Sequence, residues 1–116
     1  MQNLSEKHCQ ACEGGIPPLK DTEIKNALNQ LQNWEYDEKN KCIRKTFQFK
    51  GYLKTVSFVN AIAWIANTEN HHPDVTFSFN TCTISYQTHA VNGLTENDFI
   101  CAAKIDRLIT EPRTER

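Results

Sequence analysis

An alternation between apolar and polar side chains over residues 75–88 constrains the fold of this chain more than any other feature. A side-chain period of two is typical of strands with one buried face. Asn80-Thr81 can form a two-residue turn in the middle, because asparagine tolerates the left-handed conformation that such turns need. The pattern therefore predicts an antiparallel hairpin in which Phe79 pairs with Cys82. The apolar residues predicted to share one face are Val75, Phe77, Phe79, Cys82, Ile84 and Tyr86.

A second hairpin is predicted over residues 34–49, with a polar turn at residues 37–41. Ile43 and Phe47 fall on one face of its second strand. Lys45 interrupts that face, which predicts that this strand lies at a sheet edge or frays at its end.

Helical periodicity predicts a first helix over residues 22–31, capped by Asp21 or Thr22. A last helix is expected from near Thr95, where Thr-Glu-Asn-Asp resembles a capping box that ends on Asp98. A longer helix is expected over residues 52–68. Its apolar residues cover more than the stripe that one sheet contact requires, which predicts that it also forms a subunit interface.

The order of these elements is α-β-β-α-β-β-α. With short hairpins it predicts an α+β fold, a four-stranded antiparallel sheet with three helices on one face. Gly14-Gly15 and the prolines after them exclude a continuous helix or strand near the start, so residues 1–20 are expected to be irregular. A single domain is predicted over residues 21–110, followed by a polar tail over residues 111–116.

Composition narrows the classes of function. The 116 residues suffice for one domain, and the net charge of −1 without a basic run excludes the electrostatic footprint of a nucleic-acid binder. No apolar stretch approaches the ~20 residues that span a bilayer, and no signal sequence is seen, so a soluble cytoplasmic protein is expected. The five scattered cysteines are expected to be reduced, with Cys42, Cys82 and Cys101 in the core or sheet.

Three of the four histidines lie close together in the sequence, in His71-His72-Pro73 and at His89. In the predicted hairpin register His72 lies opposite His89, and Asp98 follows in the first turn of the last helix. Such a cluster suits proton transfer near neutral pH. The alternative is structural: a histidine pair can simply end a helix, and Asp98 can simply cap one. His8 is interpreted as an ordinary surface histidine.

A metal site is the weaker alternative. Adjacent histidines seldom point the same way, and they lack the spacing that presents two ligands from a helix. Cys9 and Cys12 form one CxxC, which is half of a four-ligand zinc site. A reduced, exposed pair in a mobile N-terminal segment is the preferred interpretation.

The run His71-His72-Pro73, then Phe79, His89 and Asp98, resembles the signature of the pterin-4a-carbinolamine dehydratases. The similarity covers about residues 20–109, and its supporting stretches are residues 93–98 and 102–106. Residues 8–12 look like the bacterial branch of the family. One departure is Asn67, which stands where the family usually has an ionisable residue, with Glu69 close by.

The resemblance implies dehydration of 4a-hydroxytetrahydropterin to quinonoid dihydropterin, which recycles the pterin of aromatic amino acid hydroxylases such as phenylalanine hydroxylase. His71, His72 and His89 are then the catalytic set: His71 and His89 act as acid and base in an unassigned order, and His72 orients the pterin. Asp98, Pro73 and Phe79 support the site. The reaction requires no cofactor and no metal.

The resemblance also implies a homodimer or homotetramer. The alternative function is a non-catalytic dimerisation module of the same fold, acting as a transcriptional cofactor.

Overall fold

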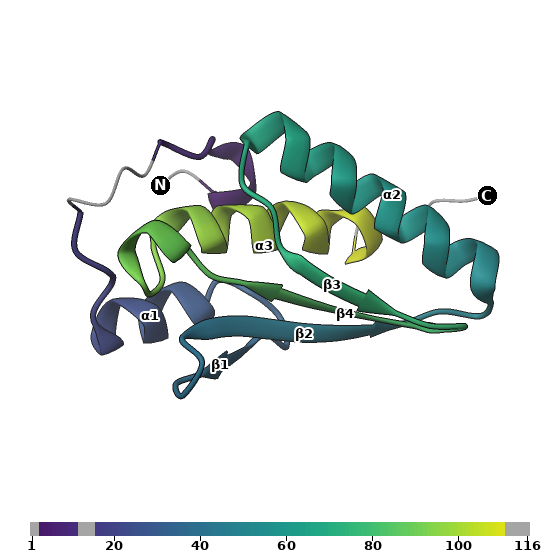
Figure 1. Ribbon diagram of the computed structural model, residues 1–116, viewed down its shortest axis with the longest axis horizontal. Helices are drawn as coiled ribbons and strands as arrows, with labels where there is room; N and C mark the ends of the chain where they lie inside the picture. The colour runs from purple at the N-terminus through teal and green to yellow at the C-terminus, as the bar shows by residue number, and fades with distance from the viewer. Residues whose placement is uncertain (1–2, 12–15, 111–116) are drawn as a thin grey trace.

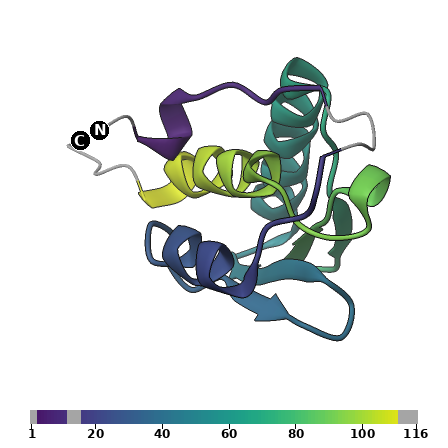
Figure 2. The ribbon, with the colours of Figure 1, turned by 90° about the vertical axis from the view of Figure 1, so that its left-hand side faces the viewer.

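The structure is a computed structural model that describes residues 3–11 and 16–110. A four-stranded antiparallel sheet in the order β1-β2-β4-β3 carries the helices on one face (Figures 1 and 2). The predicted α+β fold and its element order are confirmed. The elements are η1 (Leu4–Glu6), α1 (Asp21–Leu28), β1 (Glu35–Asp37), β2 (Cys42–Gln48), α2 (Tyr52–Glu69), β3 (Asp74–Phe77), β4 (Thr81–Tyr86), η2 (His89–Val91) and α3 (Glu96–Thr110).

The hairpin of β3 and β4 forms as predicted, but its register is two residues away from the predicted one. Phe77, not Phe79, pairs with Cys82. The chain reverses at Phe79 and Asn80, where the Ser78 N–H donates to the Thr81 carbonyl at 3.0 Å. A shift of two residues preserves which side chains share a face, so the buried face was predicted correctly. The pairing of His72 with His89 was wrong, because it depended on the register.

Tertiary contacts explain the position of this turn. The Asn80 carbonyl accepts a hydrogen bond from the Phe49 N–H at 2.8 Å, which ties the turn to the end of β2. The Phe79 carbonyl accepts from the Thr55 hydroxyl at 3.0 Å, which ties it to α2. These partners are distant in sequence, so the local preference of asparagine did not decide the register.

Lys45 was predicted to mark an edge or a frayed end, and this prediction is wrong. β2 lies between β1 and β4 in the middle of the sheet. The Lys45 ammonium is 2.8 Å from a carboxylate oxygen of Asp106 on α3, and its side chain is only 11% exposed. The same carboxylate accepts from the Trp34 indole N–H at 3.0 Å. The break in the apolar face is therefore a buried polar contact between the sheet and α3.

α1 is shorter than predicted. It ends at Leu28 instead of Leu31, and the next residues make the tighter i→i−3 hydrogen bonds, such as Leu31 N–H to the Leu28 carbonyl at 3.0 Å. Its N-cap is Lys20, not Asp21 or Thr22, and the Lys20 N–H donates to the Glu23 carboxylate at 2.7 Å. The apolar spacing continued past Leu28, but the backbone turns there to bring Trp34 into the core.

α2 runs as predicted, and it separates its apolar residues onto two sides. Phe58 and Ile62 are buried against the sheet, whereas Leu53 is 78% and Trp64 74% exposed. The helix ends at Glu69, and the positive φ of 54° at the following Asn70 reverses the chain toward β3. None of the helices among the described residues is long and apolar enough to cross a membrane.

Residues 3–11 were predicted to be irregular, yet they contain η1 and pack on α3 (Figure 2). The side chain of Leu4 is buried, and the Lys104 ammonium donates to the Ser5 carbonyl at 2.9 Å. This packing carries residues 9–11 past the end of α2. The predicted polar tail over residues 111–116 lies outside the described residues.

Candidate active site

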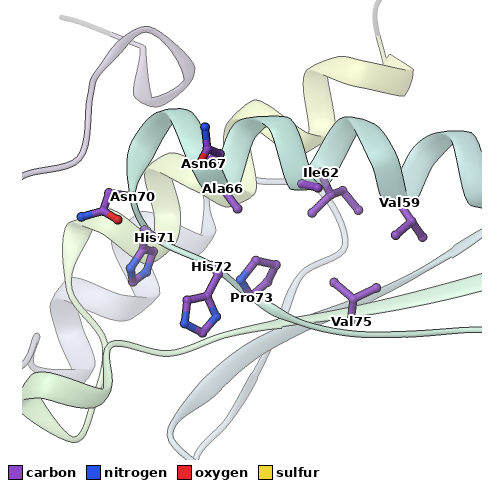
Figure 3. Close-up of a pocket in the computed structure, with 10 residues that line it drawn as sticks. Val59, Ile62, Ala66, Asn67, Asn70, His71, His72, Pro73 and Val75 are labelled. Atoms are coloured by element: carbon purple, nitrogen blue, oxygen red, sulfur yellow. The ribbon is translucent and has the colours of Figure 1, made fainter.

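Two hollows adjoin at the connection between α2 and β3. The first, of about 440 Å³, is largely apolar and lies between α2 and β3 (Figure 3). The second, of about 400 Å³, is bounded by that connection, by η2 and by the N-terminal segment. Asn70, His71 and His72 line both hollows. In Figure 3 the two imidazole rings extend to the same side of the connection, although adjacent histidines seldom do so.

His71 is held by a buried carboxylate. Its Nε2 atom lies 2.7 Å from Oδ1 of Asp98, its ring stacks on Tyr86, and its side chain is 14% exposed. Burial is the largest influence on the pKa of His71 and lowers it. The hydrogen bond and the negative charge of Asp98 outweigh burial, so the pKa of His71 is raised above its ordinary value. This arrangement favours the imidazolium form in a partly dry site.

Asp98 has both of the roles that the sequence left open. It is fully buried in the first turn of α3, where its Oδ2 atom accepts from the Thr95 N–H at 3.0 Å and from the Thr88 hydroxyl at 2.8 Å. The first contact is the carboxylate half of the predicted capping box, and the Asp98 N–H donates to the Thr95 carbonyl at 3.1 Å. Its other oxygen binds His71. The carboxylate therefore connects the start of α3, the loop that follows β4 and the histidine.

His89 reaches the same hollow as His71 and His72 by a different route from the predicted one. It begins η2, a short turn closed by the left-handed Asn92, whose N–H donates to the His89 carbonyl at 3.1 Å. The base of this loop is closed between Thr88 and Gly93. The three histidines thus line one hollow, but strand pairing does not set His72 against His89.

The N-terminal segment is a part of the site that sequence reasoning missed. Cys9, Gln10 and Ala11 line the second hollow. Gln10 is held to Asn97 of α3 by two hydrogen bonds, N–H to Oδ1 at 3.0 Å and Nδ2–H to the Gln10 carbonyl at 2.6 Å. The available signal was Leu4, an apolar residue in a segment that was treated as irregular.

Glu69 faces the N-terminal segment. Its carboxylate accepts from the Cys9 N–H at 2.7 Å, and its other oxygen lies 2.9 Å from Nδ1 of His8. Burial alone would raise the pKa of Glu69, but these contacts and the charge of Lys104 lower it below its ordinary value. His8 is exposed, as expected of a surface histidine, yet it has this specific partner. Asn67, at the departure from the family pattern, lines the first hollow.

Pro73 and Phe79, the two remaining predicted site residues, lie in different parts of the structure. Pro73 lines the first hollow beside His72. Phe79 lies at the turn between β3 and β4, at the far end of the hairpin from the histidines, and is 64% exposed. It lines neither hollow within this chain.

The prediction that Cys9 belongs to an exposed, mobile pair is wrong for Cys9. Its sulfur lies 3.5 Å from the sulfur of Cys101, which is fully buried on α3. Cys12 lies outside the described residues. Cys42, Cys82 and Cys101 are buried, as predicted. Among residues 3–11 and 16–110, no group of three or more His, Cys, Asp or Glu side chains is arranged to hold a metal ion.

Comparison with known proteins identifies the family of this chain. Residues 17–108 match the family described as pterin 4 alpha carbinolamine dehydratase. A protein of Legionella pneumophila (strain Corby), provisionally named pterin-4-alpha-carbinolamine dehydratase, is 54% identical over 110 residues, covering 94% of this chain and 97% of the relative. The chain belongs to the pterin-4a-carbinolamine dehydratase family. The resemblance predicted from the sequence is confirmed.

Other members of the family and of the fold extend this result. A relative from Nitrosospira multiformis with the same provisional name is 53% identical over 108 residues, covering 93% of this chain and 94% of the relative. The crystal structure of a transcriptional coactivator/pterin dehydratase from Brucella melitensis superposes with a TM-score of 0.76 at 28% identity, covering 78% of this chain and 97% of that one. A pterin dehydratase-like RuBisCO assembly factor of the alpha-carboxysome, at 24% identity and a TM-score of 0.58, shares the fold.

Proposed function

We propose that this chain removes water from 4a-hydroxytetrahydropterin to give quinonoid dihydropterin, with two of its three clustered histidines transferring protons and the third orienting the substrate. The relatives carry the name of a hydro-lyase, and an enzyme of this class is what the sequence predicted. The observation that carries the histidine mechanism is one hollow lined by His71, His72 and His89, with His71 bound to the buried carboxylate of Asp98.

The reaction needs an acid and a base. Hydroxide is a poor leaving group, so the oxygen on C4a must gain a proton and leave as water. N5 must lose its proton as the C4a=N5 double bond forms. Groups with pKa values near the working pH do both most effectively.

His71 is the proposed acid. The contact with Asp98 favours its protonated form, and that contact occupies Nε2, which leaves Nδ1 as the nitrogen that exchanges a proton with the substrate. His89 is the proposed base, because it lines the same hollow from a separate loop. His72 orients the pterin between them. The next turnover begins after His89 has returned a proton to His71 by way of solvent.

The second hollow has a lining suited to a pterin. A pterin is a flat bicycle whose edge carries amide and amine groups, and ligand sites typically combine a concave surface with a few polar groups. Amide, hydroxyl and imidazole side chains line this hollow, and Gln87 and Thr88 supply two of them. The adjoining apolar hollow is positioned to accept the less polar part of the substrate.

The proposed reaction uses neither a metal nor a redox cofactor, because the pterin does not change oxidation state overall. Metal analysis of the purified protein and assay after chelation test this statement. Stoichiometric zinc whose removal abolishes turnover would contradict it.

The direct test is the rate of quinonoid dihydropterin formation from 4a-hydroxytetrahydropterin, with the protein and without it. We expect the protein to exceed the spontaneous dehydration, and His8→Ala to keep that rate because His8 does not line either hollow. A rate equal to the spontaneous one would overturn the proposal.

The physiological setting is part of the same proposal. The substrate is the pterin that aromatic amino acid hydroxylases produce, notably phenylalanine hydroxylase, so the reaction would recycle it, and we place the reaction in the cytoplasm. The exposed side of α2, with Leu53 and Trp64, supports a homodimer or homotetramer.

A second candidate function is a transcriptional cofactor, which the Brucella melitensis structure favours because it is described as both coactivator and dehydratase. Such a module would dimerise but would not need the histidines. Loss of turnover in His71→Ala with an unchanged oligomeric state separates the two functions.

A further inference from the structure

Two sulfur atoms from distant parts of the chain lie close together beside the second hollow. The Sγ atoms of Cys9 and Cys101 are 3.5 Å apart, although the residues are 92 positions apart in sequence. Cys9 is half-buried and lines the hollow, whereas Cys101 is fully buried on α3. The proposed dehydration uses neither thiol.

Two contacts hold Cys9 in this position. Its N–H donates to the Glu69 carboxylate at 2.7 Å, and its thiol lies 3.7 Å from the Asn97 carbonyl. The neighbouring Gln10 is bound to Asn97 through both its N–H and its carbonyl. A disulfide has its sulfurs about 2.05 Å apart, so a closure of about 1.5 Å between side chains would bond them.

The surroundings also activate the pair. The hydrogen bond from Cys9 is the largest influence on the pKa of Cys101 and lowers it; burial opposes this, while Tyr86 and the charge of His71 lower it further. The net direction is down, and the pKa of Cys9 is correspondingly raised. The lowered pKa favours the thiolate form of Cys101, and thiolate character is what makes a cysteine reactive toward oxidants.

We propose that Cys9 and Cys101 are a reversible modification site, converted by a peroxide into a disulfide that locks the N-terminal segment onto α3. Cys9 is the sulfur that a peroxide reaches, since it lines the hollow. Cys9 first passes its proton to the Cys101 thiolate across their 3.5 Å contact. The Cys9 thiolate then attacks the peroxide, which breaks the O–O bond, gives a sulfenic acid on Cys9 and releases water. Cys101 then attacks that sulfur, and the hydroxyl leaves as a second water. Both sulfurs are oxidised by one electron each, the peroxide takes up two, and a small-molecule thiol reverses the bond.

The disulfide would act on the site in two ways. It draws residues 9–11, which line the hollow, toward α3. It also removes the negative charge of the Cys101 thiolate. In the reduced protein that charge raises the pKa of His71. Oxidation should then slow turnover and move the titration of His71, the proposed acid, to lower pH. This consequence rests on the proposed dehydratase function, whereas formation of the disulfide does not.

The test treats the full chain with hydrogen peroxide, blocks the remaining thiols by alkylation and maps cross-linked peptides by mass spectrometry without reduction. Cleavage after Glu96 separates Cys101 from Cys82. Because no such cleavage separates Cys9 from Cys12, the mapping is also done in Cys12→Ser. We expect the link in the wild type and in Cys12→Ser, its absence in Cys9→Ser, and its reversal by dithiothreitol.

The outcomes are distinguishable. A link that survives Cys9→Ser and disappears in Cys12→Ser, or no link to Cys101 at all, would overturn the modification site. A link that forms without any change in turnover would overturn its effect on the active site. Reduced protein without turnover would instead refute the dehydratase proposal and leave the mapped disulfide standing. Peroxide should leave the turnover of Cys9→Ser equal to that variant's own untreated rate if the proposal is correct.

Discussion

The Nε2 atom of His71 lies 2.7 Å from Oδ1 of Asp98, and this contact joins the end of α2 to the first turn of α3. Asp98 has no exposed surface, and its second oxygen is occupied by Thr88 and Thr95. A carboxylate this constrained holds the imidazole in one orientation. Its negative charge also outweighs the cost of burying a charged ring, so the protonated form of the imidazole is favoured.

Asp98→Asn should lower the pKa of His71. The variant keeps the shape of the side chain but removes the charge, so burial becomes the dominant influence and should lower the pKa. The pH profile of turnover and the NMR titration of the imidazole both report it. Asp74→Asn, which removes an exposed carboxylate on β3, is the matched control and should leave both titrations in place.

The same pair makes stability depend on pH. Because the pKa of folded His71 is raised above its unfolded value of about 6.5, the contribution of this histidine is complete below that value and is lost as pH rises through the folded pKa. The free energy of unfolding should fall over this window in the wild type and fall less in Asp98→Asn. Equal slopes for both proteins would show that the pair does not titrate.

His72→Ala and His89→Ala should each lose most of the dehydratase activity and remain folded. Both side chains line the hollow, so their truncation leaves no cavity in the core. For His89, the proposed base, the loss should be about 10²–10⁴-fold, which is typical of general acid–base groups. Steady-state turnover together with circular dichroism measures both properties, and His8→Ala is the control. Full activity with an unchanged spectrum would remove that residue from the mechanism.

Thr88→Val should destabilise the fold although it changes few atoms. The buried Thr88 hydroxyl bonds both Asp98 and Thr95, so its loss leaves buried polar atoms without that partner, at a cost of about 1–3 kcal/mol. Thr46→Val removes a similar hydroxyl pair with Thr83, but on an exposed face, and should cost less than about 0.5 kcal/mol. Urea denaturation compares the two, and equal losses would contradict the argument.

The outward side of α2 should form the oligomer interface. Leu53 and Trp64 are both exposed and are eleven positions apart, close to three helical turns, so they lie on one face. Trp64→Glu should dissociate the assembly into folded monomers. Phe58→Glu, on the buried face, should instead unfold the chain at a cost of about 4 kcal/mol or more.

Sedimentation combined with circular dichroism distinguishes these two results. A monomeric wild type would leave the outward face without this role. An oligomer that survives Trp64→Glu would place the interface elsewhere.

The sequence by itself determined the fold class and the faces of its strands. Strand alternation and helical spacing are local properties, and they survive an error of two residues in register, as β3 and β4 demonstrate. The capping role of Asp98 is local too, because it depends on a spacing of three residues within one turn of α3. The cluster of histidines was equally evident from residue type and spacing.

Only the tertiary structure decided which parts of the chain meet. The turn at Phe79 and Asn80 is set by Phe49 and Thr55. Lys45 is buried because α3 places Asp106 above it. Neither partner can be inferred from a local pattern, since each arrives from an element distant in sequence.

The candidate site shows the same division. Its histidines were predicted, but their approach depends on the left-handed Asn70 and Asn92, which redirect the backbone before β3 and after η2. The wall formed by residues 9–11 was missed, because an N-terminal segment with little periodicity is positioned by contacts with Glu69 and Asn97. Residue types and spacing are encoded locally, whereas contacts between distant segments depend on how the whole core packs.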